Sequence, residues 1–209
     1  MVNILFRKNT FNFKSNPKGA TLALVELSVL TAIVVVLQLL GSFIHFGLFS
    51  VTLVLIPVVL GAALYGPLAG AWLGLVFGVT VLLSGDAAPF LAINPAATVL
   101  VVLLKGAGAG FAAGLIYRLL AKKNTWVAAF AAALLCPIAN TGIFLIGGLL
   151  FFLPTLREWG EGLGYPNVGN YIIFGLVGGN FLFEVGVNLL LAPGLHRVLL
   201  LLEKRVQKK

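Results

Sequence analysis

The side chains that could do chemistry are few, and three are ionisable groups inside long apolar stretches: Glu26, Lys105 and Glu184. Ionisable groups inside a membrane are costly and mark function by default. Asn180 and Asn188 lie four residues on either side of Glu184, a spacing that places all three on one helix face. Lys105 and Glu184 lie at similar depths in their predicted helices. Glu26 is nearer to a helix end, where a structural position at the membrane interface is expected.

The sequence leaves two interpretations of these polar groups open. Lys105 and Glu184 could pair with each other and hold helices together, which would lower the burial cost of each charge. They could instead line a pocket for a small polar ligand. The candidate binding residues come from the apolar segments and from the connections at their outer ends: Lys105, Asn140, Asn180, Glu184, Asn188, Asn94, Asp86, Tyr171 and His45.

Motifs of a catalytic centre are missing from the sequence. His45 and His196 fall at opposite ends of the predicted helices, so a two-histidine metal site or a Ser–His pair does not assemble easily. There is no HExxH or GxxxxGK(S/T) motif, and Cys136 is the single cysteine. We therefore predict no catalytic residue, no metal site and no cofactor. An intramembrane enzyme that uses Glu184 or His45 in acid–base chemistry is the weakest alternative.

Membrane-spanning helices must position these side chains. Hydrophobic residues make up 60% of the 209 residues and charged residues only 10%, whereas water-soluble domains carry about 25% charged residues. A spanning helix needs about 20 mainly apolar residues. We therefore predict an all-α integral membrane protein. Its domain at residues 20–202 lies between a leader (1–19) and a basic tail (203–209), and its six transmembrane helices lie at 20–44, 48–64, 67–84, 95–120, 126–153 and 171–202.

Lysine and arginine residues predict how these helices are oriented. They cluster before the first span, between the fourth and fifth, and after the sixth, so with six spans all three clusters fall on one side. By the positive-inside rule both termini are then cytoplasmic. This topology and anionic lipid headgroups explain the net charge of +8, so nucleic acid is not an expected partner. A single helix over 48–84 would be too long for a bilayer, and Pro67 is a suitable helix start.

Small residues recur at four-residue intervals in three of the predicted spans. In lipid, close approach of backbones supplies the energy of helix association, and this spacing keeps the small residues on one side of a helix. We predict that the glycines of the third and fourth spans form packing grooves: Gly66, Gly70, Gly74, Gly78, Gly106, Gly110 and Gly114. Ser28 and Ala32 have the same spacing in the first span, whose face could be offered to another protein.

Several longer stretches together resemble a known family. They are LSVLTAIVVVLQ in the first span, LIPVVLGAALYGPLAGAWLGLVFGVTVLL across the second and third, INPAATVLVVLLKGAGAGFAAGLIYRLL in the fourth, and the Asn- and Glu-bearing last helix. The chain resembles in these stretches the substrate-binding S components of energy-coupling factor (ECF) transporters, which import vitamins. The resemblance covers most of the chain, and the Gly-Pro-x-x-Gly turn is its most specific part.

The resemblance implies a six-helix bundle in a prokaryotic plasma membrane, with a ligand pocket near the outer face. It implies a transmembrane coupling protein and two cytosolic ATPases as partners, with Ser28 and Ala32 at the docking position, where the family more often has two alanines. The implied ligand is a small water-soluble vitamin or precursor: pantothenate first, then vitamin B6 or hydroxymethylpyrimidine, with riboflavin or folate behind. A stand-alone ion-coupled carrier or channel for a small polar solute stays as the alternative.

Overall fold

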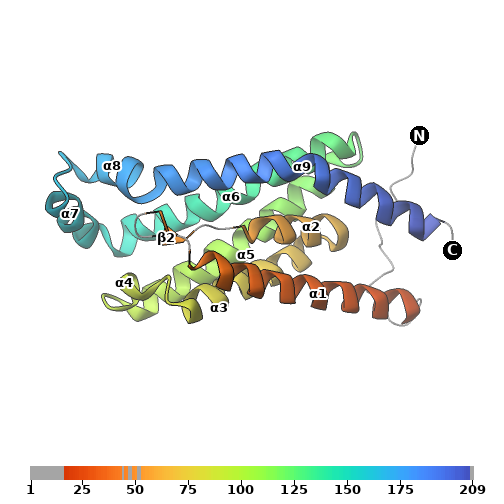
Figure 1. Cartoon of the computed structure of the whole chain (residues 1–209), viewed down its shortest axis with the longest axis horizontal. Coiled ribbons are helices and arrows are strands. Elements are labelled where there is room, and N and C mark those ends of the chain that lie inside the picture. The colour runs from red at the N-terminus through yellow and green to blue at the C-terminus, as the bar shows by residue number, and fades with distance from the viewer. Residues whose placement is uncertain (1–16, 44, 47–48, 51–52, 208–209) are drawn as a thin grey trace.

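The computed structural model describes residues 17–43, 45–46, 49–50 and 53–207. Within these residues the chain is almost entirely helical, and its long helices run along the long axis of the molecule (Figure 1). β1 and β2 form a small antiparallel hairpin. In chain order the elements are α1 (Pro17–Gly41), β1 (His45–Phe46), β2 (Phe49–Ser50), α2 (Leu55–Tyr65), α3 (Pro67–Ser84), α4 (Ala88–Leu91), α5 (Pro95–Leu120), α6 (Thr125–Phe151), α7 (Leu153–Gly162), α8 (Val168–Asn170), the π-helix η1 (Tyr171–Val177) and α9 (Gly178–Gln207).

The helical character of the chain agrees with the prediction, but the number of spans does not. Among the described residues five helical segments are long and apolar enough to cross a membrane: Thr21–Gly41, Pro67–Ser84, Pro95–Leu120, Thr125–Phe151 and Val168–Leu201. At the predicted span 48–64 the structure has α2, which contains 11 residues. At 1.5 Å per residue α2 is about 16 Å long, roughly half the hydrocarbon thickness. The prediction of six full spans is therefore not confirmed.

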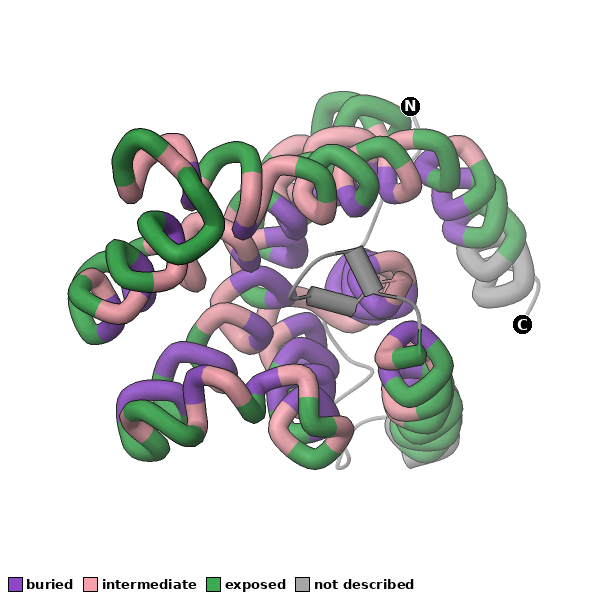
Figure 2. Tube along the Cα trace, turned by 60° about the vertical axis from the view of Figure 1, so that its left-hand side comes forward, coloured by how far each residue is buried: buried purple, intermediate pink, exposed green. Residues whose placement is uncertain are grey.

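α2 lies inside the bundle rather than at its edge. It contacts α1, α3, α5, α6 and α9, and most of its residues are buried. Figure 2 shows the same pattern for the whole molecule, with buried residues on the inward sides of the helices and exposed residues on the outward sides. Contact with lipid requires an apolar outward face. Because the short helix α2 lies at the centre, the other helices pack around it and the bundle has a buried core.

The break between α2 and α3 falls where the sequence predicted it. Gly66 has a φ of 93°, a left-handed conformation that glycine adopts without a steric penalty. Pro67 then occupies the first turn of α3, where its missing N–H would have no helical partner in any case. A Cβ at Gly66 would meet nothing within 4 Å, so this glycine serves the turn rather than the predicted packing groove.

The glycines of α3 and α5 bring the two helix backbones into direct contact. A Cβ atom at Gly70 would overlap the carbonyl oxygen of Gly110, and a Cβ at Gly74 would overlap that of Gly106. At Gly78 the added atom would lie 2.8 Å from the Val102 oxygen. The α5 glycines face α3 in return, and a Cβ at Gly114 would lie 2.6 Å from Pro67 Cα. We call this contact the glycine seam.

The two ends of the bundle differ in structure and charge. α4, α7 and α8 lie at one end, while the start of α1 and the end of α9 lie at the other (Figure 1). The second end also carries the turn between α5 and α6, where Lys122 and Lys123 are exposed. α7, at the first end, is amphipathic: Leu156 is buried, whereas Arg157 and Glu158 are exposed. The start of α1 and the end of α9 thus lie at the same end of the bundle as the exposed lysines.

Candidate functional site

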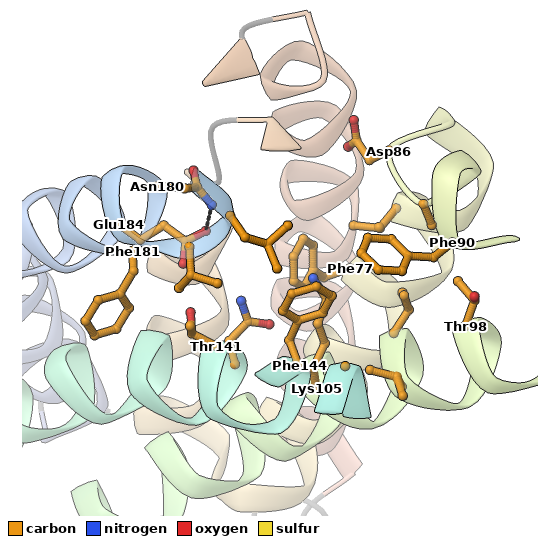
Figure 3. A pocket seen from close by; sticks show the side chains of 18 of the residues that line it. Phe77, Asp86, Phe90, Thr98, Lys105, Thr141, Phe144, Asn180, Phe181 and Glu184 are labelled. Atoms are coloured by element: carbon orange, nitrogen blue, oxygen red, sulfur yellow. Dashed lines mark hydrogen bonds between the residues drawn. The ribbon is translucent and has the colours of Figure 1, made fainter. Parts of the chain in front are cut away.

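A cavity of about 60 Å³ lies among α1, α3, α5, α6 and α9. It is in the half of the bundle that carries α4, and side chains from these separate elements converge on it (Figure 3). Five of the predicted binding residues line it: Asp86, Lys105, Asn140, Asn180 and Glu184. A mixed polar and aromatic lining inside an apolar bundle sets this region apart from the rest of the core.

α5 supplies one wall because its first turn is fixed by local hydrogen bonds. The side chain of Asn94 caps the helix and accepts a hydrogen bond from Ala97 N at 3.1 Å, and Pro95 occupies the first turn. Thr98 Oγ1 donates to Asn94 O at 2.8 Å. Thr98 and Lys105, two turns apart, then fall on the same face of α5 and reach the cavity.

α9 contributes the predicted polar stripe as a chain of hydrogen bonds. Asn180 Nδ2 donates to Glu184 Oε1 at 3.1 Å (Figure 3). One turn further on, Asn188 Nδ2 donates to the Glu184 carbonyl oxygen at 2.8 Å. Glu184 is only 1% exposed. Asn180 and Glu184 therefore line the cavity together. Asn188 is bound to the helix backbone by its own hydrogen bond and is not a lining residue.

A second amide–carboxylate pair comes from α1 and from the turn after α3. Gln38 Nε2 donates to Asp86 Oδ2 at 2.6 Å. Ser84 Oγ donates to the same carboxylate oxygen at 3.0 Å. Gln38 is 1% exposed, and both Gln38 and Asp86 line the cavity. This pair connects α1 to the end of α3 across the cavity wall.

Lys105 places its ammonium group against two aromatic faces. Its Nζ lies 5.7 Å from the centroid of the Phe77 ring and 5.3 Å from that of Phe144. A cation over the face of an aromatic ring is stabilised by the ring quadrupole. Lys105 and Glu184 both line the cavity (Figure 3), so a ligand between them would meet a positive group on one side and a negative group on the other.

Aromatic rings close the cavity toward the end of the bundle that carries α4 and α7. Phe90 packs edge to face on Phe144 and Phe152, with ring centroids 5.7 and 5.1 Å apart. Trp159 of α7 adds a third ring 5.4 Å from Phe90. Phe90, Phe144 and Phe152 are also cavity-lining residues. We call Phe90, Phe144, Phe152 and Trp159 the aromatic roof.

The remaining predicted site residues do not line the cavity in this structure. Asn94 serves as a helix cap, and Asn188 bonds to the helix backbone. Tyr171 is 1% exposed and packs against Tyr165, with ring centroids 5.5 Å apart. His45 belongs to β1, but its side chain lies outside the described residues. Across the described part of the chain, no group of three His, Cys, Asp or Glu side chains could hold a metal ion.

Sequence reasoning missed several lining residues. The most informative of them is Gln38. It is a lone amide in the apolar run VVVLQLL, and a polar side chain in such a run is a signal from which a site residue could have been predicted. The aromatic residues gave no comparable signal because phenylalanine is common throughout the chain. The additional lining residues include Gln38, Phe77, Phe90, Thr98, Thr141, Phe144, Phe152 and Phe181.

Comparison with known proteins shows which family the chain belongs to. The family model described as "ECF transporter, substrate-specific component" matches residues 22–196. None of the curated proteins and none of the solved structures compared with the chain matches it. The match covers most of the chain and includes every residue that lines the cavity. The chain therefore belongs to the family of substrate-specific components of ECF transporters, which are membrane transport subunits and not enzymes.

Proposed function

We propose that this chain binds a small water-soluble vitamin or vitamin precursor in the cavity and delivers it into the cell as the S component of an ECF importer. The observation that carries the proposal is the cavity itself. Two carboxylates, a lysine and three amides from four helices and the turn after α3 meet in the middle of an otherwise apolar bundle. Burying a polar atom is unfavourable unless it is hydrogen-bonded, and a polar ligand would supply partners to the three amide oxygens of the lining that have none among the described residues.

The cavity must widen to admit such a ligand. A volume of about 60 Å³ holds a few water molecules, whereas sites for small organic molecules measure about 300–1,000 Å³. The aromatic roof is the part that would move, because Phe90 lies on the four-residue helix α4 and Trp159 on the amphipathic α7. Ligand entry is therefore expected from the end of the bundle that carries α4 and α7.

Membrane orientation and partners follow from the same arrangement. Exposed Lys122 and Lys123 mark one end of the bundle, which the positive-inside rule assigns to the cytoplasm. Entry beneath the aromatic roof would then be from outside. Family membership implies an ECF module, made of a coupling protein and ATPases, as the source of energy. The exposed small residues Ser28 and Ala32 of α1 are the proposed docking position for the coupling protein.

The identity of the vitamin stays a prediction. Resemblance placed pantothenate first, followed by vitamin B6 or hydroxymethylpyrimidine. Lys105 could bind the carboxylate of pantothenate through a charge-assisted hydrogen bond. Asp86 and Glu184 line the same cavity, however, and would repel that carboxylate, which weakens the case for an anionic vitamin.

The test is to purify the chain from its membrane and identify by mass spectrometry what co-purifies with it. Thermal-shift screening against the water-soluble vitamins should then raise the unfolding temperature for one of them. If nothing co-purifies and no vitamin stabilises the chain, the proposal is wrong. Reconstitution in liposomes separates the alternative: an S component needs the ECF module and ATP for uptake, whereas an ion-coupled carrier would transport alone under a pH or sodium gradient.

A further inference from the structure

The two amide–carboxylate pairs of the cavity fix which way their amide groups point. A carboxylate accepts hydrogen bonds but does not donate them, so Gln38 must turn its NH₂ group to Asp86 and Asn180 its NH₂ group to Glu184. The oxygen of each amide therefore points away from its carboxylate. This orientation follows from the hydrogen bonding itself, which removes the usual ambiguity between amide nitrogen and oxygen.

Three amide oxygens of the cavity lining have no hydrogen-bond donor among the described residues. Gln38 Oε1, Asn140 Oδ1 and Asn180 Oδ1 are buried and lack a partner among the residues that the structure describes. All three residues line the cavity. A buried acceptor without a partner is unfavourable by about 1–3 kcal/mol. The cavity is thus short of donors, and a ligand that carries N–H groups would satisfy these acceptors, whereas a ligand rich in acceptors would not.

The charge of the cavity lining also favours a ligand that carries N–H donors. The charged side chains among its described lining residues are Lys105, Asp86 and Glu184, which gives one positive and two negative formal charges. The lining side chains therefore carry an excess of one negative formal charge. Electrostatic attraction and repulsion are stronger in an apolar interior than in water, so a ligand with a single positive charge is favoured and a carboxylate is disfavoured.

The shape of the lining suggests a flat ligand. Phe77 and Phe144 both present ring faces to the Lys105 ammonium, and Phe90 and Phe181 add further rings to the wall. Aromatic faces stack on planar rings and attract cations. Polar acceptors at the edges and aromatic rings beside them form a suitable environment for a heteroaromatic ring that carries donors at its periphery.

We propose that the ligand of this chain is a planar nitrogen base, protonated and carrying N–H donors, and not a carboxylate. This inference rests on the proposed function, because it concerns the same cavity. It assigns Gln38, Asn140 and Asn180 as acceptors of the ligand's N–H groups, with Glu184 and Asp86 balancing its charge. The order of vitamins expected from resemblance is thereby reversed, with the bases ahead of pantothenate.

The experiment measures affinities of the purified full-length chain by calorimetry for two pairs of probes. Pyridoxamine and 4-pyridoxate share a ring and differ in an amine or a carboxylate, which isolates charge. Hydroxymethylpyrimidine, which carries a ring amine, is compared with pantothenate. We expect at least one base to bind, and to bind at least tenfold more tightly than the carboxylate in its pair.

Variants connect the preference to the cavity. Glu184→Gln should reduce the preference for the base at least fivefold, because it removes one negative charge while keeping the shape. Glu161→Gln is the matched control, since Glu161 is exposed on α7 and is not a lining residue. An unchanged preference in Glu184→Gln, with a folded protein by thermal unfolding, would overturn the assignment of that residue and with it the inference.

Other outcomes separate this inference from the proposed function. Tighter binding of pantothenate or 4-pyridoxate than of the bases overturns the inference and leaves the proposed function standing. Failure of both bases to bind also overturns it. If, in addition, no other water-soluble vitamin binds, the proposed function fails as well.

Discussion

Two faces of α5 make opposite kinds of contact. On one face, Gly106 and Gly110 bring the α5 backbone against the backbone of α3, with no room for a single added carbon atom. On another face, Thr98 and Lys105 reach a cavity with buried polar groups. Both faces belong to one continuous helix, so the side chains rather than the backbone geometry decide which contact forms.

This difference separates stability from binding along one helix. The glycine seam gains van der Waals contact over its whole length, which is the main source of helix association in lipid. The cavity leaves Gln38, Asn140 and Asn180 each with an amide oxygen that lacks a partner among the described residues, which lowers stability until a ligand supplies donors. Substitutions in the seam should therefore affect folding, and substitutions around the cavity should mainly affect ligand binding.

The largest expected effect is that of Gly74→Ala in the seam. The added Cβ would overlap the backbone of Gly106, and a backbone in a packed helix pair cannot move aside as a flexible side chain can. We expect the free energy of unfolding to fall by about 3 kcal/mol, at the upper end for overpacking. Denaturation with increasing SDS in mixed micelles measures this change.

The matched control for Gly74→Ala is Gly142→Ala in α6. A Cβ at Gly142 would meet nothing within 4 Å, and alanine is the better helix former. Its free energy of unfolding should therefore stay equal or rise slightly. Equal losses in the two variants would show that any glycine substitution in these helices is destabilising, and the distinction between seam and cavity would fail.

Lys105→Met should have an intermediate effect on stability and a selective effect on binding. Removing the ammonium leaves Asp86 and Glu184 without the positive group that faces the same cavity, so we expect a loss of about 2 kcal/mol. Affinity for a protonated base should be retained or increase. Affinity for a carboxylate should fall at least tenfold, the equivalent of about 1.4 kcal/mol.

Calorimetry on Lys105→Met and on Lys122→Met checks this prediction. Lys122 is exposed in the turn after α5 and is not a lining residue, so its variant should bind like the original protein. A drop in base affinity that is confined to Lys105→Met would show that the ammonium contacts the base directly, and would contradict the charge balance inferred for the cavity.

Gly175→Ala in the π-helix η1 should have a smaller effect. The added Cβ would lie 2.8 Å from Tyr171 Cδ2 and 2.9 Å from the Tyr165 hydroxyl oxygen, and these side-chain atoms can shift. We expect about 1 kcal/mol of destabilisation relative to Gly179→Ala, whose Cβ would meet nothing within 4 Å. SDS denaturation of both variants measures the difference. A Gly175→Ala variant as stable as Gly179→Ala would show that the two tyrosines do not pack closely there.

The sequence predicted the seam better than the cavity for a physical reason. Glycine spacing along one helix is a local pattern, so the bounds of α3 and α5 and the small-residue face could be read directly. The polar stripe of Asn180 and Glu184 was predicted in the same way, from four-residue spacing. Gly66 was grouped with the seam because spacing alone does not reveal its φ of 93°.

Non-local contacts account for most of what the sequence could not provide. Gln38 is hydrogen-bonded to Asp86, which is 48 residues further along the chain. No helical or strand periodicity predicts a contact at that separation. α2 was predicted as a full span because its flanking residues are apolar, but the helix starts only at Leu55. Asn94 and Tyr171 have the residue types of ligand contacts, yet a helix cap and an aromatic contact use them instead.

The smallest effect on stability is expected where small residues have no neighbour to pack against. Ala32 is exposed on α1, one helical turn after Ser28, which is exposed as well. Ala32→Leu adds apolar atoms to a face on which Val25, Val29 and Val36 are already exposed. The free energy of unfolding should therefore change by less than about 0.5 kcal/mol, and ligand affinity should be unchanged.

If this face is the proposed docking position, the same variant should no longer co-purify with the coupling protein, because a bulky residue prevents close approach of backbones. Val29→Leu is the matched control on the same face and should keep the complex. A loss of stability in Ala32→Leu comparable to that of Gly74→Ala would instead place Ala32 in an internal contact, and the small residues of α1 would then belong with the seam.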